Sequence, residues 1–211
     1  GRPNLSELVL RRFLELIDIP FLMVPAATAS HLPLIDRLQS IYEFDGITIN
    51  RGDFYPSLYN FAYEQCTGDY FMHLENDFYW DNIDAVSNAV LALKTYPDID
   101  FVRMEIFPWN ERHMISILDI GTDRLGILKP PERGGPDYQF NCNPHVRRDR
   151  LPPGGFPTER TKIHWEYTVS EMWSKYGKVS ACLMGKNFRH IGIYSEGGHY
   201  KSGYSDRFTL R

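Results

Sequence analysis

Short apolar runs alternate with helical patterns through the first half of the chain, and this alternation limits the possible folds. The runs at 21–24, 46–50, 68–74 and 100–106 have the composition of buried strands. Helical spacing of apolar residues falls between them, at 4–16, 33–42, from Pro56 onward and at 82–94. The pattern predicts an α/β fold, with a mixed, mainly parallel central sheet and helices on both faces.

The ends of these segments carry further predictions. Asn4-Leu5-Ser6-Glu7 has the form of a capping box that opens the first helix. In the second helix, Leu34, Leu38 and Ile41 are expected to face inward. Proline and glycine clusters after Pro108 predict long loops. One later helix is expected at 165–176, with Tyr176 inward and Gly177 as its stop.

Two acids follow the apolar run that ends at Leu74. Glu75 and Asp77 are two residues apart, and such side chains share one side of a strand, with Asn76 opposite. Mg²⁺ sites combine one or two carboxylates with substrate phosphates and water. In parallel sheets, ligands sit at the carboxyl ends of strands. The loops after Val24, Asn50 and Leu74 are therefore expected to converge on one crevice, with a solvated strand end as the alternative for the acids.

Composition narrows the functional classes. The chain has 211 residues and a formal net charge of −4, which gives no electrostatic case for nucleic-acid binding. Its three cysteines are far apart and lack zinc-ligand spacing, which favours free thiols. No apolar stretch has the length of a membrane span, and no secretory signal is present. The abrupt ends would suit a domain cut from a longer chain.

A series of short motifs resembles the inverting nucleotide-sugar glycosyltransferases of GT-A fold, the large family typified by bacterial polysaccharide synthases. These motifs occur in the family's order at 24–26, 50–52, 60–62, 68–70, 74–77, 154–156, 165–167 and 177. There are two departures. Glu75 stands where the family usually has Asp, and Tyr167 replaces a common Asp, which leaves Glu166 as the acid of the acceptor motif.

The resemblance implies a Rossmann-like GT-A catalytic domain over 1–211, with a nucleotide-sugar-binding half at 20–107 and an acceptor half at 108–211. It implies metal-dependent hexosyl transfer, with inversion, from a nucleoside-diphosphate sugar, UDP-linked by family habit, to a glycan or glycoprotein. Within the family the chain looks closest to a chlorella-virus-encoded domain, which implies viral glycoprotein glycosylation in the host-cell cytoplasm.

The resemblance also assigns roles to individual residues. Asp77 is the expected ligand of Mn²⁺ or Mg²⁺, with His190 as a second ligand. Glu166 is the expected general base, at a helix N-terminus that stabilises its charged form, and Glu159 is the second candidate. The donor is expected to contact residues of three loops, namely Ala26, Thr28, Arg51, Asp53, Glu75 and Asn76.

Alternatives remain at each level. Glu166 is also explained as a helix-stabilising acid and His190 as a strand cap. For Arg147 and Arg148 we expect exposed loop charge rather than phosphate contact. A retaining transferase with the same donor site and a non-catalytic carbohydrate-binding domain are the other functional classes. Nucleotidyltransfer is disfavoured, because Pro25-Ala26-Ala27-Thr28 is not a glycine-rich phosphate loop.

Overall fold

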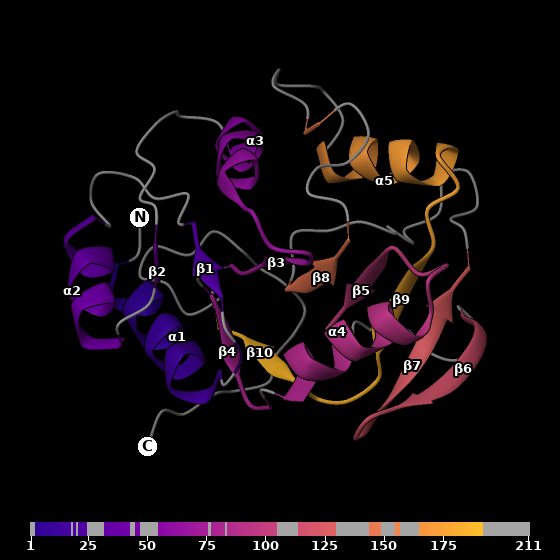
Figure 1. Ribbon diagram of the computed structural model, residues 1–211, viewed down its shortest axis with the longest axis horizontal. Coiled ribbons are helices and arrows are strands. Elements are labelled where there is room, and N and C mark those ends of the chain that lie inside the picture. Colours follow the sequence, from indigo (N-terminus) through magenta and orange to yellow (C-terminus); the bar gives the residue numbers. More distant parts are fainter. Residues whose placement is uncertain are drawn as a thin grey trace.

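The computed structural model describes residues 3–17, 19, 21–24, 32–42, 45–46, 55–75, 77–82, 84–104, 114–129, 144–148, 155–156 and 165–191. The helices among these residues are α1 (Pro3–Leu16), α2 (Leu32–Tyr42), α3 (Tyr55–Gln65), α4 (Asp84–Thr95) and α5 (Trp165–Lys175). The strands of the first half are β1 (Leu22–Met23), β2 (Asp45–Gly46), β3 (Phe71–His73), β4 (Phe78–Trp80) and β5 (Phe101–Arg103). Those of the second half are β6 (Met114–Ile120), β7 (Asp123–Leu128), β8 (His145–Arg147), β9 (Ser180–Leu183) and β10 (Phe188–His190). Figure 1 shows their arrangement.

The largest sheet has six strands in the order β3-β8-β5-β9-β7-β6. Only β5 and β9 pair in parallel, and the other neighbours are antiparallel, so the expectation of a mainly parallel sheet is wrong for the described residues. The reason lies in the second half. Strand β8 comes from a region predicted to be loop, and it inserts between β3 and β5, which themselves run in the same direction.

Strands β6 and β7 form a hairpin at 114–128, where the sequence analysis predicted no strand. The hairpin closes through a short turn in which Gly121 has φ +53°, a conformation that glycine adopts without steric cost. Strands β1 and β2 form a separate parallel pair, at the places where the sequence predicts strands. The mixed α/β prediction is therefore confirmed, while the strand directions are corrected.

The helices fall close to their predicted positions, with three corrections. Helix α1 begins at Pro3, so Asn4 lies inside the first turn and the capping box is wrong. Proline suits a first turn because its missing N–H has no helical partner there. Ile41 is 50% exposed and Tyr176 is 64% exposed, so neither faces the core as predicted. Gly177 has φ +68° and ends α5 as expected.

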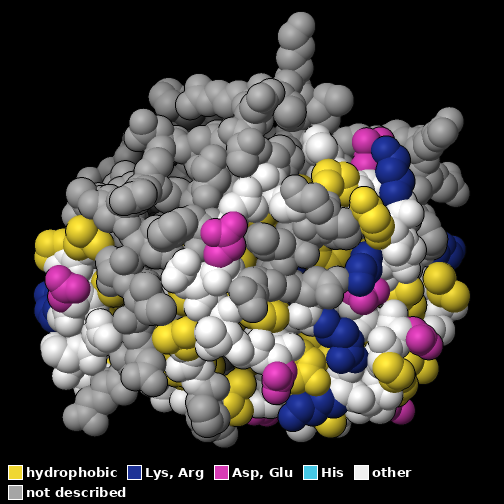
Figure 2. Space-filling model, turned by 45° about the horizontal axis from the view of Figure 1, so that its top comes forward, with side chains coloured by type: hydrophobic (Ala, Val, Ile, Leu, Met, Phe, Trp, Pro, Cys, Tyr) yellow, Lys and Arg dark blue, Asp and Glu magenta, His cyan; other side chains and the backbone are white. Residues whose placement is uncertain are grey.

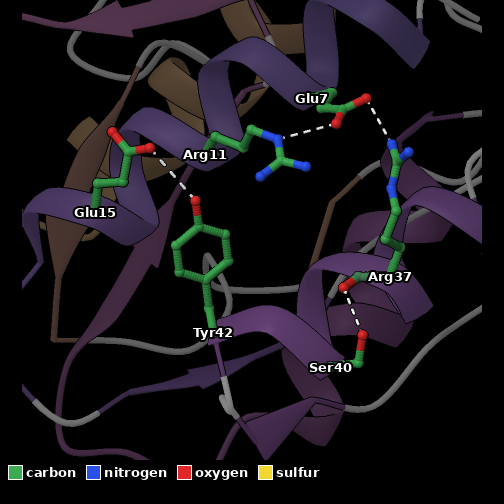
Figure 3. Close-up of polar contacts among 6 residues, drawn as sticks. All are labelled: Glu7, Arg11, Glu15, Arg37, Ser40 and Tyr42. Atoms are coloured by element: carbon green, nitrogen blue, oxygen red, sulfur yellow. Dashed lines mark hydrogen bonds and ion pairs between the residues drawn. The ribbon is translucent and has the colours of Figure 1, made fainter.

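Glu7, expected in that capping box, instead joins α1 to α2 (Figure 3). Its carboxylate accepts hydrogen bonds from Arg11 at 2.9 Å and from Arg37 of α2 at 2.6 Å. The Arg11 hydrogen bond and the two positive charges lower the pKa of Glu7. The two helices are thus fastened by an ion-pair network at their surface.

Along the inner strands of the sheet, successive side chains point to opposite faces. Val102 and Val146 are register partners and face the core formed with α1, α2 and α4, and α4 lies against β5 and β8 (Figure 1). The residues on either side of them point the other way. Phe71 and Phe101 lie there, in a second cluster with Tyr63 of α3 and side chains of α5. This second face carries the polar residues described below.

A second antiparallel pair, β4 with β10, extends from the acid segment. The register pairs Phe188 with Trp80 and His190 with Phe78. Helix α1 packs on β4, where the rings of Phe13 and Trp80 are 5.7 Å apart. The segment 78–80 was not predicted as a strand. No helix of the described residues is both long and apolar enough to cross a membrane.

Candidate functional site

Glu75 and Asp77 lie in the connection between β3 and β4. The sequence suggested that a strand continues through both acids and places them on one side. Strand β3 instead ends at His73, so the pleat of the strand does not hold the two acids on one side. Asp77 is 9% exposed and occupies the turn directly before β4. The side chain of Glu75 is 28% exposed. The two carboxylates are therefore in different surroundings, although they stay within one short loop.

Strand β10 holds this loop from the other side. The N–H of Ile191 donates to the carbonyl oxygen of Asp77 at 2.7 Å, and His190 is the register partner of Phe78. The strand predicted before His190 is confirmed. The backbones of His190 and Asp77, which the sequence keeps far apart, are thus neighbours. The side chain of His190 lies outside the described residues.

His73, the last residue of β3, occupies the centre of the polar cluster on the second face. It is 6% exposed, and its Nδ1 atom is 2.7 Å from the hydroxyl oxygen of Tyr63. The ring of His145 stacks on it at 5.2 Å, with 7° between the planes. Burial lowers the pKa of His73 to about 3, assisted by the positive charge of Arg147 and opposed by the negative charge of Glu166.

Two of the predicted site residues meet around this histidine. The Oε1 atom of Glu75 lies 3.9 Å from Nε2 of His73. Glu166 lies in the first turn of α5 and is close enough for its charge to act on the same imidazole. The side chain of Glu166 is half-buried. A donor-side acid and the candidate base therefore flank one buried ring.

Two motifs of the resemblance are also joined here. Asn60 of α3 donates from Nδ2 to the carbonyl oxygen of Phe156 at 2.9 Å, and the N–H of Phe156 donates to Oδ1 of Asn60 at 2.7 Å. Gly155 has φ +76°, and a Cβ atom there would approach Oδ1 of Asn60 to 3.2 Å. Gly155 and Phe156 are thereby held beside α3, which no local pattern in the sequence indicates.

Arg147 and Arg148 are not exposed loop charges, so that prediction is wrong. Arg147 is 0% exposed on β8, and its guanidinium carbon lies 4.0 Å from the centre of the Tyr63 ring. Arg148 donates to the carbonyl oxygens of Ile99, at 3.0 Å, and Tyr96, at 3.4 Å. Because β8 is an inner strand of the sheet, Arg147 must point into the second face.

The remaining predictions can be compared with the structure only in part. Ala26, Thr28, Arg51, Asp53, Asn76 and Glu159 lie outside the described residues. Within the described part of the chain, no three His, Cys, Asp or Glu side chains form a metal-binding group. A cation that docks a diphosphate needs only one or two protein carboxylates, because phosphate and water supply the other oxygens. A carboxylate such as that of Asp77 supplies the kind of oxygen ligand that Mn²⁺ and Mg²⁺ bind.

The surface agrees with the low net charge. In the view of Figure 2, Lys and Arg side chains are interspersed with Asp and Glu among the described residues. No broad basic patch appears among the described side chains on that face.

Comparison with known proteins adds the fold class. No protein-family model matches the chain, and no curated protein matches its sequence. Among solved structures, it is similar to the mannosyltransferase PcManGT from Pyrobaculum calidifontis in complex with GDP-Man and Mn²⁺, with a TM-score of 0.56 and 16% identity. The match covers 84% of this chain and 50% of that chain, so the present chain spans half of its length. At this identity the likeness shows the fold: the chain has a GT-A-like, mixed α/β fold of the kind found in a glycosyltransferase.

Proposed function

We propose that this chain is a metal-dependent glycosyltransferase that moves a sugar, a hexosyl group by family resemblance, from a nucleoside-diphosphate donor to a glycan or glycoprotein. One observation supports this most. Glu75 and Glu166, proposed for the donor and for base catalysis, lie around the same buried histidine although they are far apart in the sequence. The GT-A-like fold supplies the context.

The proposed reaction is an inverting displacement. The acceptor hydroxyl oxygen forms a bond to the anomeric carbon, and the bond from that carbon to the diphosphate oxygen breaks. Glu166 takes the hydroxyl proton as the new bond forms, and the nucleoside diphosphate leaves with the electron pair of the broken bond. A half-buried carboxylate in the first turn of α5 suits this role, because the acceptor must reach it.

Asp77 and His190 are the residues proposed to hold the cation. Their backbones lie beside each other in the β4–β10 pair. When bound, Mn²⁺ or Mg²⁺ neutralises the charge that develops on the leaving diphosphate. Glu75 is proposed to hydrogen-bond the donor's ribose. The loop residues Ala26, Thr28, Arg51, Asp53 and Asn76 complete the proposed donor site.

The donor nucleotide is tested directly by titration. The family resemblance favours UDP, whereas the structurally similar mannosyltransferase was solved with GDP-Man. Calorimetric titrations of UDP and GDP, with and without Mn²⁺, should show metal-enhanced binding of one of them. Asp77→Ala should remove that enhancement. Asp81→Ala, at the other end of β4, is the matched control and should retain it.

A companion experiment tests the base. Glu166→Gln should lower kcat by about 10²–10⁴-fold, the usual contribution of a general base, while nucleotide affinity stays unchanged. Glu171→Gln, an exposed acid of the same helix, is the control. Equal activity of the two variants would show that Glu166 is not the general base, and Glu159 would be the next candidate to test.

The alternative classes give different results. A retaining transferase would yield the opposite anomer, which NMR of the product distinguishes. A non-catalytic carbohydrate-binding domain would bind sugar without metal-enhanced nucleotide affinity. The viral origin and host-cell cytoplasm implied by the resemblance stay predictions, as does the division into a donor half and an acceptor half.

A further inference from the structure

The surroundings of His73 fix the plane of its ring. The Tyr63 hydroxyl contacts Nδ1 at 2.7 Å, and His145 stacks on the ring. The Tyr59 ring packs against it edge-on, at 4.9 Å and 90°. These contacts come from β8 and from two residues of α3 one helical turn apart. These contacts fix the orientation of the His73 ring, so a group that hydrogen-bonds to Nε2 must be oriented to suit the ring.

The neutral ring has two possible tautomers, and its contacts select one. The pKa of about 3 means that the imidazole is neutral at physiological pH, with one N–H. If the Tyr63 hydroxyl donates to Nδ1, the proton is on Nε2. The reverse arrangement would direct the lone pair of Nε2 toward the carboxylate of Glu75, which is repulsive. The negative charge of Glu75 therefore favours the Nε2–H form.

In this tautomer, Nε2 of His73 is a buried hydrogen-bond donor without an acceptor among the described residues. The Oε1 atom of Glu75 lies just beyond bonding range at 3.9 Å. Leaving a buried donor without an acceptor is unfavourable. The Glu75 side chain is 28% exposed, so its carboxylate lies between the buried ring and the surface.

We propose that Tyr63 and His73 are positioning residues for the nucleoside-diphosphate donor: Tyr63 holds the imidazole at Nδ1, and Nε2–H orients the Glu75 carboxylate toward the donor's ribose. This inference rests on the proposed function and extends it to two residues that contact no substrate. Donor binding closes the 3.9 Å gap, since it fixes Glu75 in the orientation that His73 favours.

The first test is the tautomer itself. Long-range ¹H–¹⁵N NMR of histidine-labelled protein, with His73→Gln to assign the signal, should show a neutral ring protonated at Nε2 from pH 7 to pH 5. Tyr63→Phe should shift the ring toward a mixture of tautomers. Tyr59→Phe, which leaves the Nδ1 contact in place, is the control. A ring protonated at Nδ1 in the unmodified protein would overturn the inference.

The second test is a double-mutant cycle on UDP and GDP affinity in Mn²⁺. His73→Asn removes the donor at Nε2 and should weaken binding about tenfold, as expected for a hydrogen bond to a charged group. His73→Gln places an amide N–H near that point and should restore most of the affinity. In a Glu75→Gln background, His73→Asn should have little further effect, because the residue it positions has lost its charge.

The outcomes separate this inference from the proposed function. Additive losses in the cycle, or equal losses in the Asn and Gln variants, would refute the positioning role while nucleotide binding stands. Should His73→Asn fail to fold, Tyr63→Phe provides the same cycle with Glu75→Gln. If the unmodified chain binds neither nucleotide, the proposed function fails, and the donor part of this inference fails with it.

Discussion

Acid should destabilise the folded protein through His73. In the folded state this buried ring has a pKa of about 3, while in the unfolded chain it returns to about 6.5. Between these values the unfolded state binds a proton that the folded state does not, so stability falls as the pH decreases. The contribution of His73 is fully present above its unfolded pKa and is lost progressively toward pH 3.

The size of the effect follows from linkage. For one group with these two pKa values, the free energy of unfolding should fall by about 2 kcal/mol between pH 7 and pH 5. This figure hardly depends on the folded pKa, provided that it stays below about 4, because the folded ring is then neutral at both pH values. It is a large part of the stability of a typical domain.

Urea unfolding at pH 7 and pH 5 measures the effect. His73→Gln removes the titrating group, so the difference between the two pH values should shrink by about 2 kcal/mol relative to the unmodified protein. Tyr63→Phe alters the same cluster without removing that group and should keep most of the difference. An identical pH dependence in the unmodified protein and His73→Gln would show that the ring is not held neutral, and would refute the reasoning.

Three further predictions concern packing, turns and the cation. Arg147→Ala should cost about 2–4 kcal/mol, because it leaves a cavity at a fully buried side chain and removes the contact with the Tyr63 ring. Arg148→Ala should cost about 1–2 kcal/mol through its lost hydrogen bonds, and the reverse order in urea unfolding would contradict the assigned environments. Gly177→Ala should cost about 1 kcal/mol for its positive φ alone. Gly121→Ala should cost more, because its Cβ would collide with Oδ1 of Asn88, and equal unfolding midpoints for the two variants would argue against that contact. EDTA should abolish sugar transfer, and Mn²⁺ should restore it, while the thermal midpoint without nucleotide stays within about 2 °C, since the diphosphate completes the metal site; unfolding by EDTA would indicate a structural metal instead.

Periodicity predicted the helices well because each buries one apolar stripe. The stripe of α4 and the stop of α5 at Gly177 needed only local information. The directions of the strands could not be predicted from local information alone. Strand β8 reads His145-Val146-Arg147, and a strand with buried polar residues at alternate positions lacks the apolar signal by which strands are recognised. The sheet was therefore predicted without the strand that separates β3 from β5.

The candidate site divides in the same way. Glu75, Asp77 and Glu166 could be proposed from the sequence because acids near strand and helix ends have recognisable chemistry. His73 was not predicted as a site residue, because its surroundings depend on Tyr63, which only the packing of α3 on the sheet places beside it. The bond pair between Asn60 and Phe156 is likewise long-range, and no local pattern predicts it.

The central claim is that this chain transfers sugar from a nucleoside diphosphate in a metal-dependent way. The most direct measurement is turnover across a panel of UDP- and GDP-linked sugars, with Mn²⁺ or with EDTA, for the unmodified chain and for Asp77→Ala. The account predicts release of the nucleoside diphosphate from at least one donor, only with the cation and only in the unmodified chain. Turnover that is unchanged by EDTA and by Asp77→Ala would contradict it, and so would the absence of both turnover and metal-enhanced nucleotide binding across the whole panel.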